Sequence, residues 1–311
     1  MSGGHRGRIA QIPIYLGKDF RMFIFQNDWK VLPMAALIAG LIAFVVGENM
    51  FVTMEGQFQC SLALTCICIW NGFFNSIQSV CRERTVIKRE HRSGLHITSY
   101  IAAHMIYQMV LCILETVILL FICNMAGIAF PTEGVITPVF LVDYGISMFL
   151  ITYAADMMSL MISSLVRNTT TAMTVMPFML IFQLIFSGGF VKLEGPAANL
   201  KGVTAAKWGL QNLCALSDYN NQPMVTLWNT IWKFRSLEIG GRQPIKMMTD
   251  YIAENNMRDQ ILLECGKYNL NPDYVKEAGN ILHCWGMLLV IIAVFACLSV
   301  VLLEFIDRDR R

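Results

Sequence analysis

The sequence predicts an all-α integral membrane protein with six transmembrane helices. Hydrophobic residues make up 55% of the chain and charged residues only 15%, against about 25% charged in an ordinary soluble domain. Mean hydropathy is +0.52. A helix needs roughly 20 apolar residues to cross a bilayer, and six stretches reach that length: about 31–52, 58–81, 98–123, 139–163, 171–191 and 281–303.

The distribution of Lys and Arg predicts which side each loop faces. The first 30 residues hold five, the segment 82–97 holds five, the turn at Arg167 is one, and the tail after Leu303 holds three. The alternate short loops, 47–57 and 124–138, hold none. Basic residues favour the cytosolic side, so we expect both termini in the cytosol of a multi-pass plasma membrane protein. The net charge of +2 gives no indication of a nucleic-acid partner.

The expected organisation has four parts: a cytosolic N-terminus (1–30), spans one to five (31–191), an extracellular loop (192–280), and span six with a cytosolic tail (281–311). Within the first part, 12–29 carries apolar residues at helical spacing with charged residues between them, which indicates an amphipathic helix on the membrane surface. It is either a generic anchor or a docking helix for a partner.

The densest charge lies in CRERTVIKREHRSG at 81–94, between spans two and three. Its length suits a short helix that extends span two and turns back at Gly94. A segment that serves only to place a loop on the cytosolic side needs Lys and Arg, because acidic residues contribute little to that effect. The interspersed Glu83 and Glu90 therefore favour specific pairing with 12–29 or with a partner protein. A plain positive-inside loop with local ion pairs is the alternative.

The run Glu83-Arg84-x-x-Ile87-x-Arg89-Glu90-x-x-x-Gly94 resembles the loop between spans two and three of ATP-binding cassette (ABC) transporters of the G subfamily. Phe186-Ser187-Gly188 resembles the family's F-S-G at the end of span five, and 207–211 (KWGLQ) resembles its R-Y-G-x-x-A-L element. The family usually has Phe where this chain has Ile87. The resemblance covers about 12–220 and span six; 221–280 has no counterpart.

The resemblance implies an exporter permease of the ABC-2 type. In this family the second cytosolic loop, here about 82–94, is the coupling helix that meets the ATPase, and 12–29 is the connecting helix. The implied coupling residues are Arg82, Glu83, Arg84, Ile87, Arg89, Glu90 and Gly94. The sequence has no Gly-x-x-x-x-Gly-Lys-Ser/Thr phosphate loop. We therefore expect no cofactor in this chain, ATP and Mg²⁺ on a separate ATPase, and a homodimer or a heterodimer with a related permease.

Polar residues inside predicted spans are functional candidates because burying them in lipid is costly. Glu115 lies in span three and Asp156 in span four, and hydroxyls such as Thr152 or Ser159 are candidate partners. By resemblance, spans two and five of two protomers line a central cavity, and we expect its cargo to be amphipathic, lipid-like or peptide- or drug-like. The expected lining residues of the cavity are Asn71, Asn75, Pro177, Ile181, Leu184 and Phe190.

Two other functions are compatible with the sequence. Glu115 and Asp156 would suit a proton-coupled secondary transporter, and the long outer segment would suit a membrane enzyme or assembly factor. Of ten Cys, Cys214 and Cys265 lie in the outer loop and could form a disulfide in an oxidising compartment. Neither a metal-ligand spacing nor a catalytic triad is evident.

Overall fold

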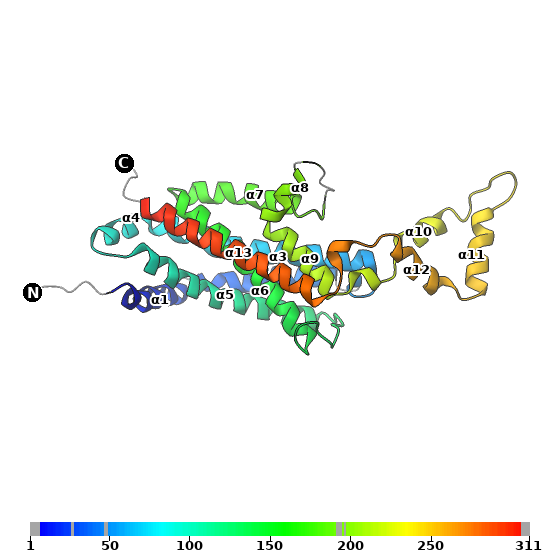
Figure 1. Cartoon of the computed structure of the whole chain (residues 1–311), viewed down its shortest axis with the longest axis horizontal. Coiled ribbons are helices and arrows are strands. Elements are labelled where there is room, and N and C mark those ends of the chain that lie inside the picture. Colours follow the sequence, from blue (N-terminus) through cyan, green and yellow to red (C-terminus); the bar gives the residue numbers. More distant parts are fainter. Residues whose placement is uncertain (1–6, 26–27, 47–48, 191–194, 196, 306–311) are drawn as a thin grey trace, which may run out of the picture.

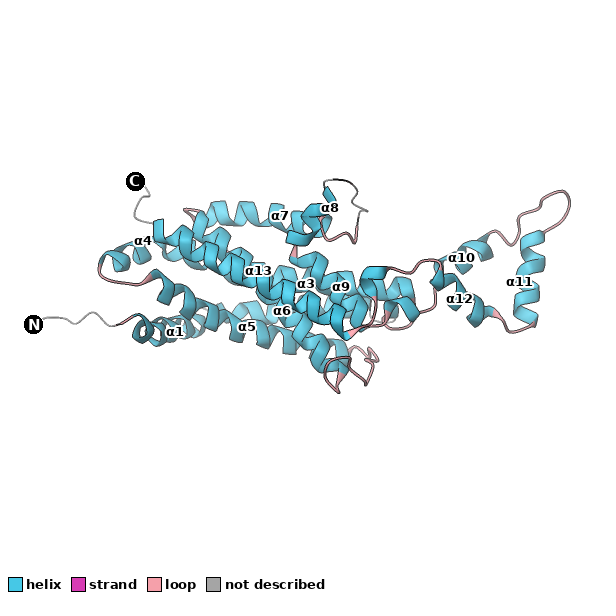
Figure 2. Ribbon diagram, in the orientation of Figure 1, coloured by secondary structure: helices cyan, strands magenta, loops and turns pink. Residues whose placement is uncertain are grey.

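The structure, a computed structural model, describes residues 7–25, 28–46, 49–190, 195 and 197–305. Within these ranges all regular structure is helical, and paired extended backbone is confined to two isolated bridges, Glu133–Val139 and Ile239–Arg242 (Figure 2). The predicted all-α class is confirmed.

Four helical segments of the described chain are long and apolar enough to cross a membrane. They are α3 (Met54–Ser76) with α4 (Ser79–Arg92), then α5 (Ile97–Met125), α6 (Phe140–Leu165) and α13 (Ala278–Glu304). Helix α6 packs against both α3 and α13 in the bundle (Figure 1). The predictions for spans three, four and six agree with α5, α6 and α13 to within a few residues.

Six spans are not confirmed. Helix α2 (Val31–Val46) has 16 residues and α7 (Thr169–Ile185) has 17, both short of the roughly 20 needed for a straight crossing. The predicted ranges 31–52 and 171–191 are therefore too long. Helix α7 stops at Phe186-Ser187-Gly188, where Gly188 has a φ of 79°. Residues 47–48, 191–194 and 196 of these predictions lie outside the described residues.

The second predicted span, 58–81, differs from the structure at both ends. Helix α3 begins earlier, at Met54, because the Thr53 side chain accepts a hydrogen bond from the Gly56 amide. It ends earlier, at Ser76, and the chain turns at Ile77 and Gln78 before α4 begins. The expected helix at 82–94 is thus α4, which starts at Ser79, ends at Arg92 and is followed by Gly94 with a φ of 104°.

The predicted outer segment, 192–280, divides into two parts. Helix α9 (Ala205–Leu216) packs among α3, α6 and α13, and all of its residues except Lys207 are buried. Helices α10 (Thr226–Lys233), α11 (Pro244–Glu254) and α12 (Arg258–Lys267) project from one end of the bundle (Figure 1). They share a small core of Trp228, Ile252 and Leu262. We call α10–α12 the outer unit. The short helices α8 (Ala197–Leu200) and η3 (Lys201–Val203) precede α9, η4 (Tyr219–Asn221) connects α9 to α10, and η5 (Pro272–Tyr274) lies between α12 and α13.

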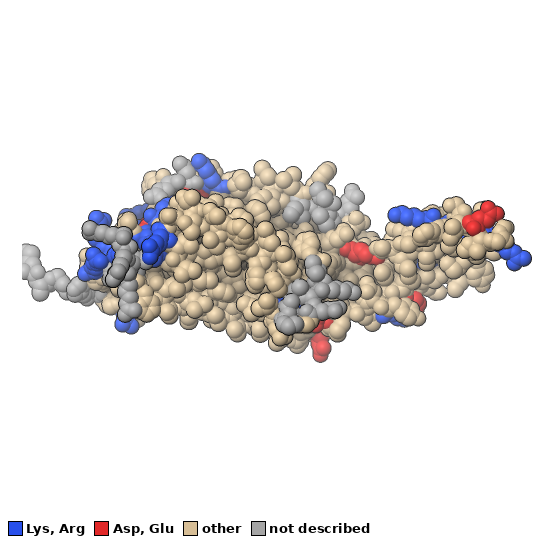
Figure 3. Space-filling view, turned by 90° about the horizontal axis from the view of Figure 1, so that it is seen from above, with Lys and Arg blue, Asp and Glu red and all other residues tan. Residues whose placement is uncertain are grey.

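At the opposite end lie α1 (Arg8–Phe25), α4 and the C-terminal end of α13 (Figure 1). Helix α1 packs on α5, and η1 (Asp28–Lys30) leads into α2. The amphipathic helix predicted over 12–29 begins earlier, so Pro13 lies inside it rather than in its first turn. Residues 26–27, and the predicted cytosolic tails at 1–6 and 306–311, lie outside the described residues. On the face in Figure 3, Lys and Arg gather at this end, beside a wide band without charged groups.

Candidate functional site

Helix α4 is joined to the end of α6 by two reciprocal sets of hydrogen bonds. The first amides of a helix have no partner within the helix, and here Ser163 of α6 accepts hydrogen bonds from the Val80 and Cys81 amides, both at 3.1 Å. The last carbonyls of a helix are likewise free. Arg84 of α4 donates to the carbonyls of Ser164 (2.8 Å) and Val166 (3.0 Å), where α6 ends.

The other side of α4 is held by α1. Lys18 forms an ion pair with Glu83 at 2.7 Å, and the Tyr15 hydroxyl donates to Glu90 at 3.0 Å. Gln11 donates to the Gly94 carbonyl and accepts from the His96 amide. Burial and the neighbouring Glu90 raise the pKa of Tyr15 above its ordinary value. Helix α1 is therefore fixed along α4 and its following turn.

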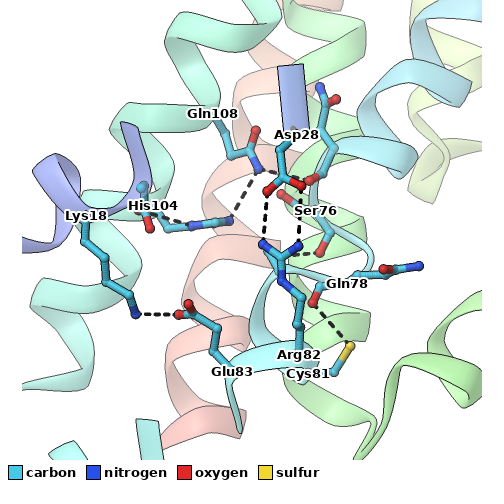
Figure 4. A network of polar contacts seen from close by, with 12 residues as sticks. Lys18, Asp28, Ser76, Gln78, Cys81, Arg82, Glu83, His104 and Gln108 are labelled. Carbon is cyan, nitrogen blue, oxygen red and sulfur yellow. Dashed lines mark hydrogen bonds and ion pairs between the residues drawn. The ribbon is translucent and has the colours of Figure 1, made fainter. Parts of the chain in front are cut away.

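Arg82 binds the segment that connects α1 with α2. Its guanidinium meets both carboxylate oxygens of Asp28 in η1, at 3.0 and 3.4 Å (Figure 4). This two-pronged geometry is the strong form of the Arg–carboxylate pair. The interspersed charges of the cluster thus do pair with the predicted 12–29 segment, as one of the two sequence interpretations expects.

The remaining predicted coupling residues separate into one buried and one exposed set. Ile87 is fully buried and joins the main core. Arg89 is exposed, and so are Thr85 and Arg92, which were not among the predicted coupling residues; the three follow one another at a spacing of three or four residues. They therefore form one stripe on the side of α4 that faces away from the bundle. We call these three residues the outer stripe of α4.

A chain of polar contacts runs from this junction into the bundle (Figure 4). Asp19 of α1 lies 3.5 Å from His104 Nδ1, and Gln108 lies 3.3 Å from His104 Nε2. Gln108 donates to the Asn75 carbonyl, and the Asn75 side chain donates to Glu115 at 2.9 Å. The α1–α4 junction is thereby connected to the buried carboxyl group of Glu115.

The two hydroxyl groups named as candidate partners of the intramembrane carboxyl groups, those of Thr152 and Ser159, donate to backbone carbonyls instead. Glu115 pairs with the amide of Asn75, one helix away. The carbonyls that Thr152 and Ser159 bind are those of Met148 and Phe73. Asp156 is fully buried beside this region, in α6.

The residues predicted to line a substrate cavity are distributed over α3, α7 and the segment that follows α7. Asn71 is buried in α3, and Asn75 reaches a cavity near α4. Pro177 and Ile181 are exposed on α7, Leu184 is half-buried, and Phe190 is exposed beyond the helix. Whether a second copy completes such a cavity stays a prediction.

The predicted disulfide is absent from the structure. Cys214 is a free, buried thiol on α9, and Cys265 is a free, half-buried thiol on α12. The two residues belong to different parts of the outer segment. Cys214 joins a core with Met54 and Leu210, whereas Cys265 lies on α12, which belongs to the outer unit.

Sequence reasoning missed the partners of the charge cluster. Ser163, Asp19, Asp28, His104 and Gln108 are essential to the junction. One signal was available: His104 and Gln108 stand four residues apart in an apolar helix, so they share a face. Asp19 gave a second signal, because it interrupts the apolar side of α1 and is buried.

Comparison with known proteins identifies the family of this chain. The ABC-2 type transporter family matches residues 18–195, more than half of the chain. The chain belongs to the ABC-2 type transporter family. The matched range includes Lys18, α4, Glu115 and Asp156. The chain is therefore a multi-pass membrane permease component of an ABC-2 type transporter.

The chain is also similar to a larger curated protein, the ABC transporter ATP-binding/permease protein Rv1747 of Mycobacterium tuberculosis (strain ATCC 25618 / H37Rv). The two are 26% identical over 157 residues, which cover 48% of this chain and 18% of that protein. The chain thus matches less than a fifth of the relative's length. The name of that protein combines an ATP-binding function with a permease function.

Proposed function

We propose that the chain is the permease of an ABC exporter and that α4 is its coupling helix, which receives motion from an ATPase docked against the outer stripe. Two permeases, identical or related, would form the pathway, and ATP and Mg²⁺ would bind on the ATPase, which we expect to be a separate subunit. The cargo class we favour is amphipathic, lipid-like or drug-like. Cytosolic placement of the α1–α4 end and of both termini belongs to the same proposal.

The observation that carries the proposal is that α4 is bound to two neighbouring helices and exposed on its third side. Its N-terminus is bound to α6 through Ser163 and its flank to α1 through Glu83 and Glu90, while Arg89 remains exposed. A force on the outer stripe would therefore reach α6 and α1 together. The exposed cations suit an acidic surface on the ATPase.

The test uses the chain purified gently from its native membrane. Arg89→Glu combined with Arg92→Glu should abolish co-purification of a protein with an ABC nucleotide-binding domain and the ATP hydrolysis of the preparation. Lys233→Glu combined with Lys246→Glu is the matched control on the exposed outer unit and should retain both. Glu83 and Arg84 are unsuitable for this test, because their contacts hold α4 against α1 and α6.

Absence of any ATPase from preparations of the native chain would overturn the proposal, as would an unchanged ATPase content in the stripe variant. Loss in both variants would show that net charge matters rather than the α4 surface.

A second function, proton-coupled transport, has one specific support: Glu115 and Asp156 are both buried carboxyl groups. Glu115→Gln separates the two functions, because an amide preserves the shape and removes the titratable proton. ATP-driven transport in reconstituted vesicles should persist in this variant. Loss of transport in Glu115→Gln, together with transport by the native chain under a proton gradient without ATP, would favour the proton-coupled function.

A further inference from the structure

A cavity of about 290 Å³ lies at the break between α3 and α4. Helix α1, η1, α5 and Met173 of α7 complete its walls. A water molecule occupies about 30 Å³ in the liquid, so the space accommodates a small headgroup. None of the predicted roles of the charge cluster makes use of this cavity.

The polar wall of the cavity is rich in hydrogen-bond acceptors. Asp19 and Gln108 both line it and are 7% and 1% exposed. Asp19 Oδ2 and Gln108 Oε1 are buried and accept no hydrogen bond from the described residues, and Asn75 Oδ1 is in the same condition. Leaving buried acceptors unsatisfied is costly. A ligand with several N–H donors would satisfy them.

The charges of the wall favour a cation. Three carboxylates (Asp19, Asp28 and Glu83) line the cavity with one guanidinium, that of Arg82. Asp28 pairs with Arg82 and Glu83 with Lys18, and the ion-pair partner of Asp19 within the described part of the chain is the imidazole of His104. Groups of three or more His, Cys, Asp or Glu suited to a metal ion are absent from the described residues. An ammonium group fits this arrangement better than a metal ion.

Apolar side chains also line the cavity, and two of them reach the surface of the bundle. Phe74, Leu111 and Met173 are among them, and Phe74 and Met173 are 38% and 37% exposed. Acyl chains could lie along these side chains outside the cavity. Arg82, also partly exposed, would face an anionic group next to the ammonium.

We propose that this cavity binds the ammonium headgroup of an aminophospholipid from the surrounding membrane. The headgroup lies between α1 and the α3–α4 break, with its nitrogen against Asp19, Gln108 and Asn75 and its phosphate toward Arg82. The acyl chains leave past Phe74 and Met173. Binding at this position holds α1 and the start of α4 around one ligand.

The test measures lipid retention by native mass spectrometry of the full chain in detergent, without nucleotide. Phosphatidylethanolamine and phosphatidylcholine with the same acyl chains are added in equal amounts; the second has the same phosphate but no N–H donor. We expect at least roughly tenfold preferential retention of phosphatidylethanolamine, the effect of losing charge-assisted hydrogen bonds. The mono- and dimethylated lipids should give intermediate retention. Equal retention across the methylation series would overturn the proposal.

Two variants test whether the lipid binds in this cavity. Asp19→Asn and Gln108→Leu should each reduce phosphatidylethanolamine retention to the phosphatidylcholine level, whereas Glu264→Gln, a carboxylate change on the exposed outer unit, should not. Preferential retention that survives both cavity variants would overturn the assignment. If either variant fails to fold, the methylation series on the native chain still decides the chemistry.

A soluble amine is the rival source of the same chemistry. Excess ethanolamine should leave the bound lipid in place, since the acyl chains contribute to its retention; displacement by ethanolamine would overturn the lipid proposal. Because no step uses ATP or an ATPase, this binding result is distinct from the outcome of the coupling test.

Discussion

At the scale of single residues, two adjacent serines at the end of α6 have different partners. Ser163 accepts two amide hydrogen bonds from the start of α4, whereas Ser164 donates to the Leu160 carbonyl within its own helix. The two residues are equally buried. Their contributions to stability should therefore differ.

We expect Ser163→Ala to lower the free energy of unfolding by about 1–2 kcal/mol, because it leaves two amides of α4 without an acceptor. Ser164→Ala, the matched control, should cost less than about 0.5 kcal/mol, because the Leu160 carbonyl keeps its helical partner. Thermal or denaturant unfolding of both variants in the same detergent measures the difference. Equal destabilisation would contradict the cap that the structure assigns to Ser163.

Single residues also show how much of the candidate site could be predicted from the sequence. The cluster at 81–94 stood out because charge is rare in this chain, and its mixed signs correctly indicated pairing with the N-terminal segment. The particular partners could not be derived: Lys18 and Glu83 are 65 residues apart and Arg84 and Ser164 are 80 residues apart. Such pairs depend on how helices pack, which a single sequence does not reveal.

At the scale of elements, α3 and α6 approach each other closely at Gly72. A Cβ placed there would lie 2.2 Å from the Thr152 carbonyl oxygen and 2.8 Å from the Asp156 amide nitrogen. Small residues permit such close helix packing in membranes. The backbone of α6 cannot yield as a flexible side chain would.

Gly72→Ala should therefore destabilise the bundle by more than about 2 kcal/mol, in the upper range for overpacking. Gly40→Ala on α2 is its control: a Cβ there meets nothing within 4 Å, and the change should be neutral or stabilise by up to about 1 kcal/mol. Unfolding midpoints of the two variants check this. A Gly72→Ala chain as stable as the native one would show that α3 and α6 are not in this contact.

Elements were predicted well where hydropathy alone decides them and poorly where packing does. The long apolar runs in the sequence correctly predicted α5, α6 and α13. Hydropathy extended the fifth span to 191, because it does not detect the turn at Gly188. Helix α9 was missed since its sequence, AAKWGLQNLCAL, is too short and too polar for a span. It is buried because α3, α6 and α13 leave room for it.

At the scale of the whole molecule, one side of α7 is apolar and exposed in a single copy, as far as the described residues show. Ile181 is 53% exposed, and Phe178 beside it is also exposed. The dimer that we propose would cover this face, whereas lipid would cover the exposed Leu289 of α13.

Disulfide crosslinking in native membranes distinguishes these environments. In a Cys297→Ser background, which removes an exposed thiol, Ile181→Cys should form a covalent dimer under mild oxidation, because two such positions would meet across the pathway. Leu289→Cys, exposed to a similar degree, should remain monomeric. Crosslinking at Leu289 but not at Ile181 would place the interface on α13 instead.

The outer unit is a second feature of the whole molecule, attached at few points. Asn220 and Asn271 exchange hydrogen bonds where the chain leaves and re-enters the bundle. Glu55 at the start of α3 accepts from the Val225 and Thr226 amides. The core of Trp228, Ile252 and Leu262 is separate from the bundle core.

Replacing 227–269 with a short Gly/Ser linker should leave the bundle folded, because the Asn220–Asn271 pair keeps the two ends together. We expect the shortened chain to elute as a single species with the native ATPase content. If α10–α12 are instead the working part of the protein, as an assembly factor would require, the shortened chain would keep its fold and lose its activity.

The unequal burial of α6 and α7 sets which helix can move at low cost. Helix α6 has 19 buried residues, while α7 has four, Ala172, Met176, Leu180 and Gln183, along one narrow stripe. Displacing α7 disturbs the contacts of these few side chains, and displacing α6 would disturb most of the core. Helix α6 is thus the more firmly held of the two, and the amides of α7, which follows the α6 end that Arg84 binds, should exchange with solvent deuterium before those of α6.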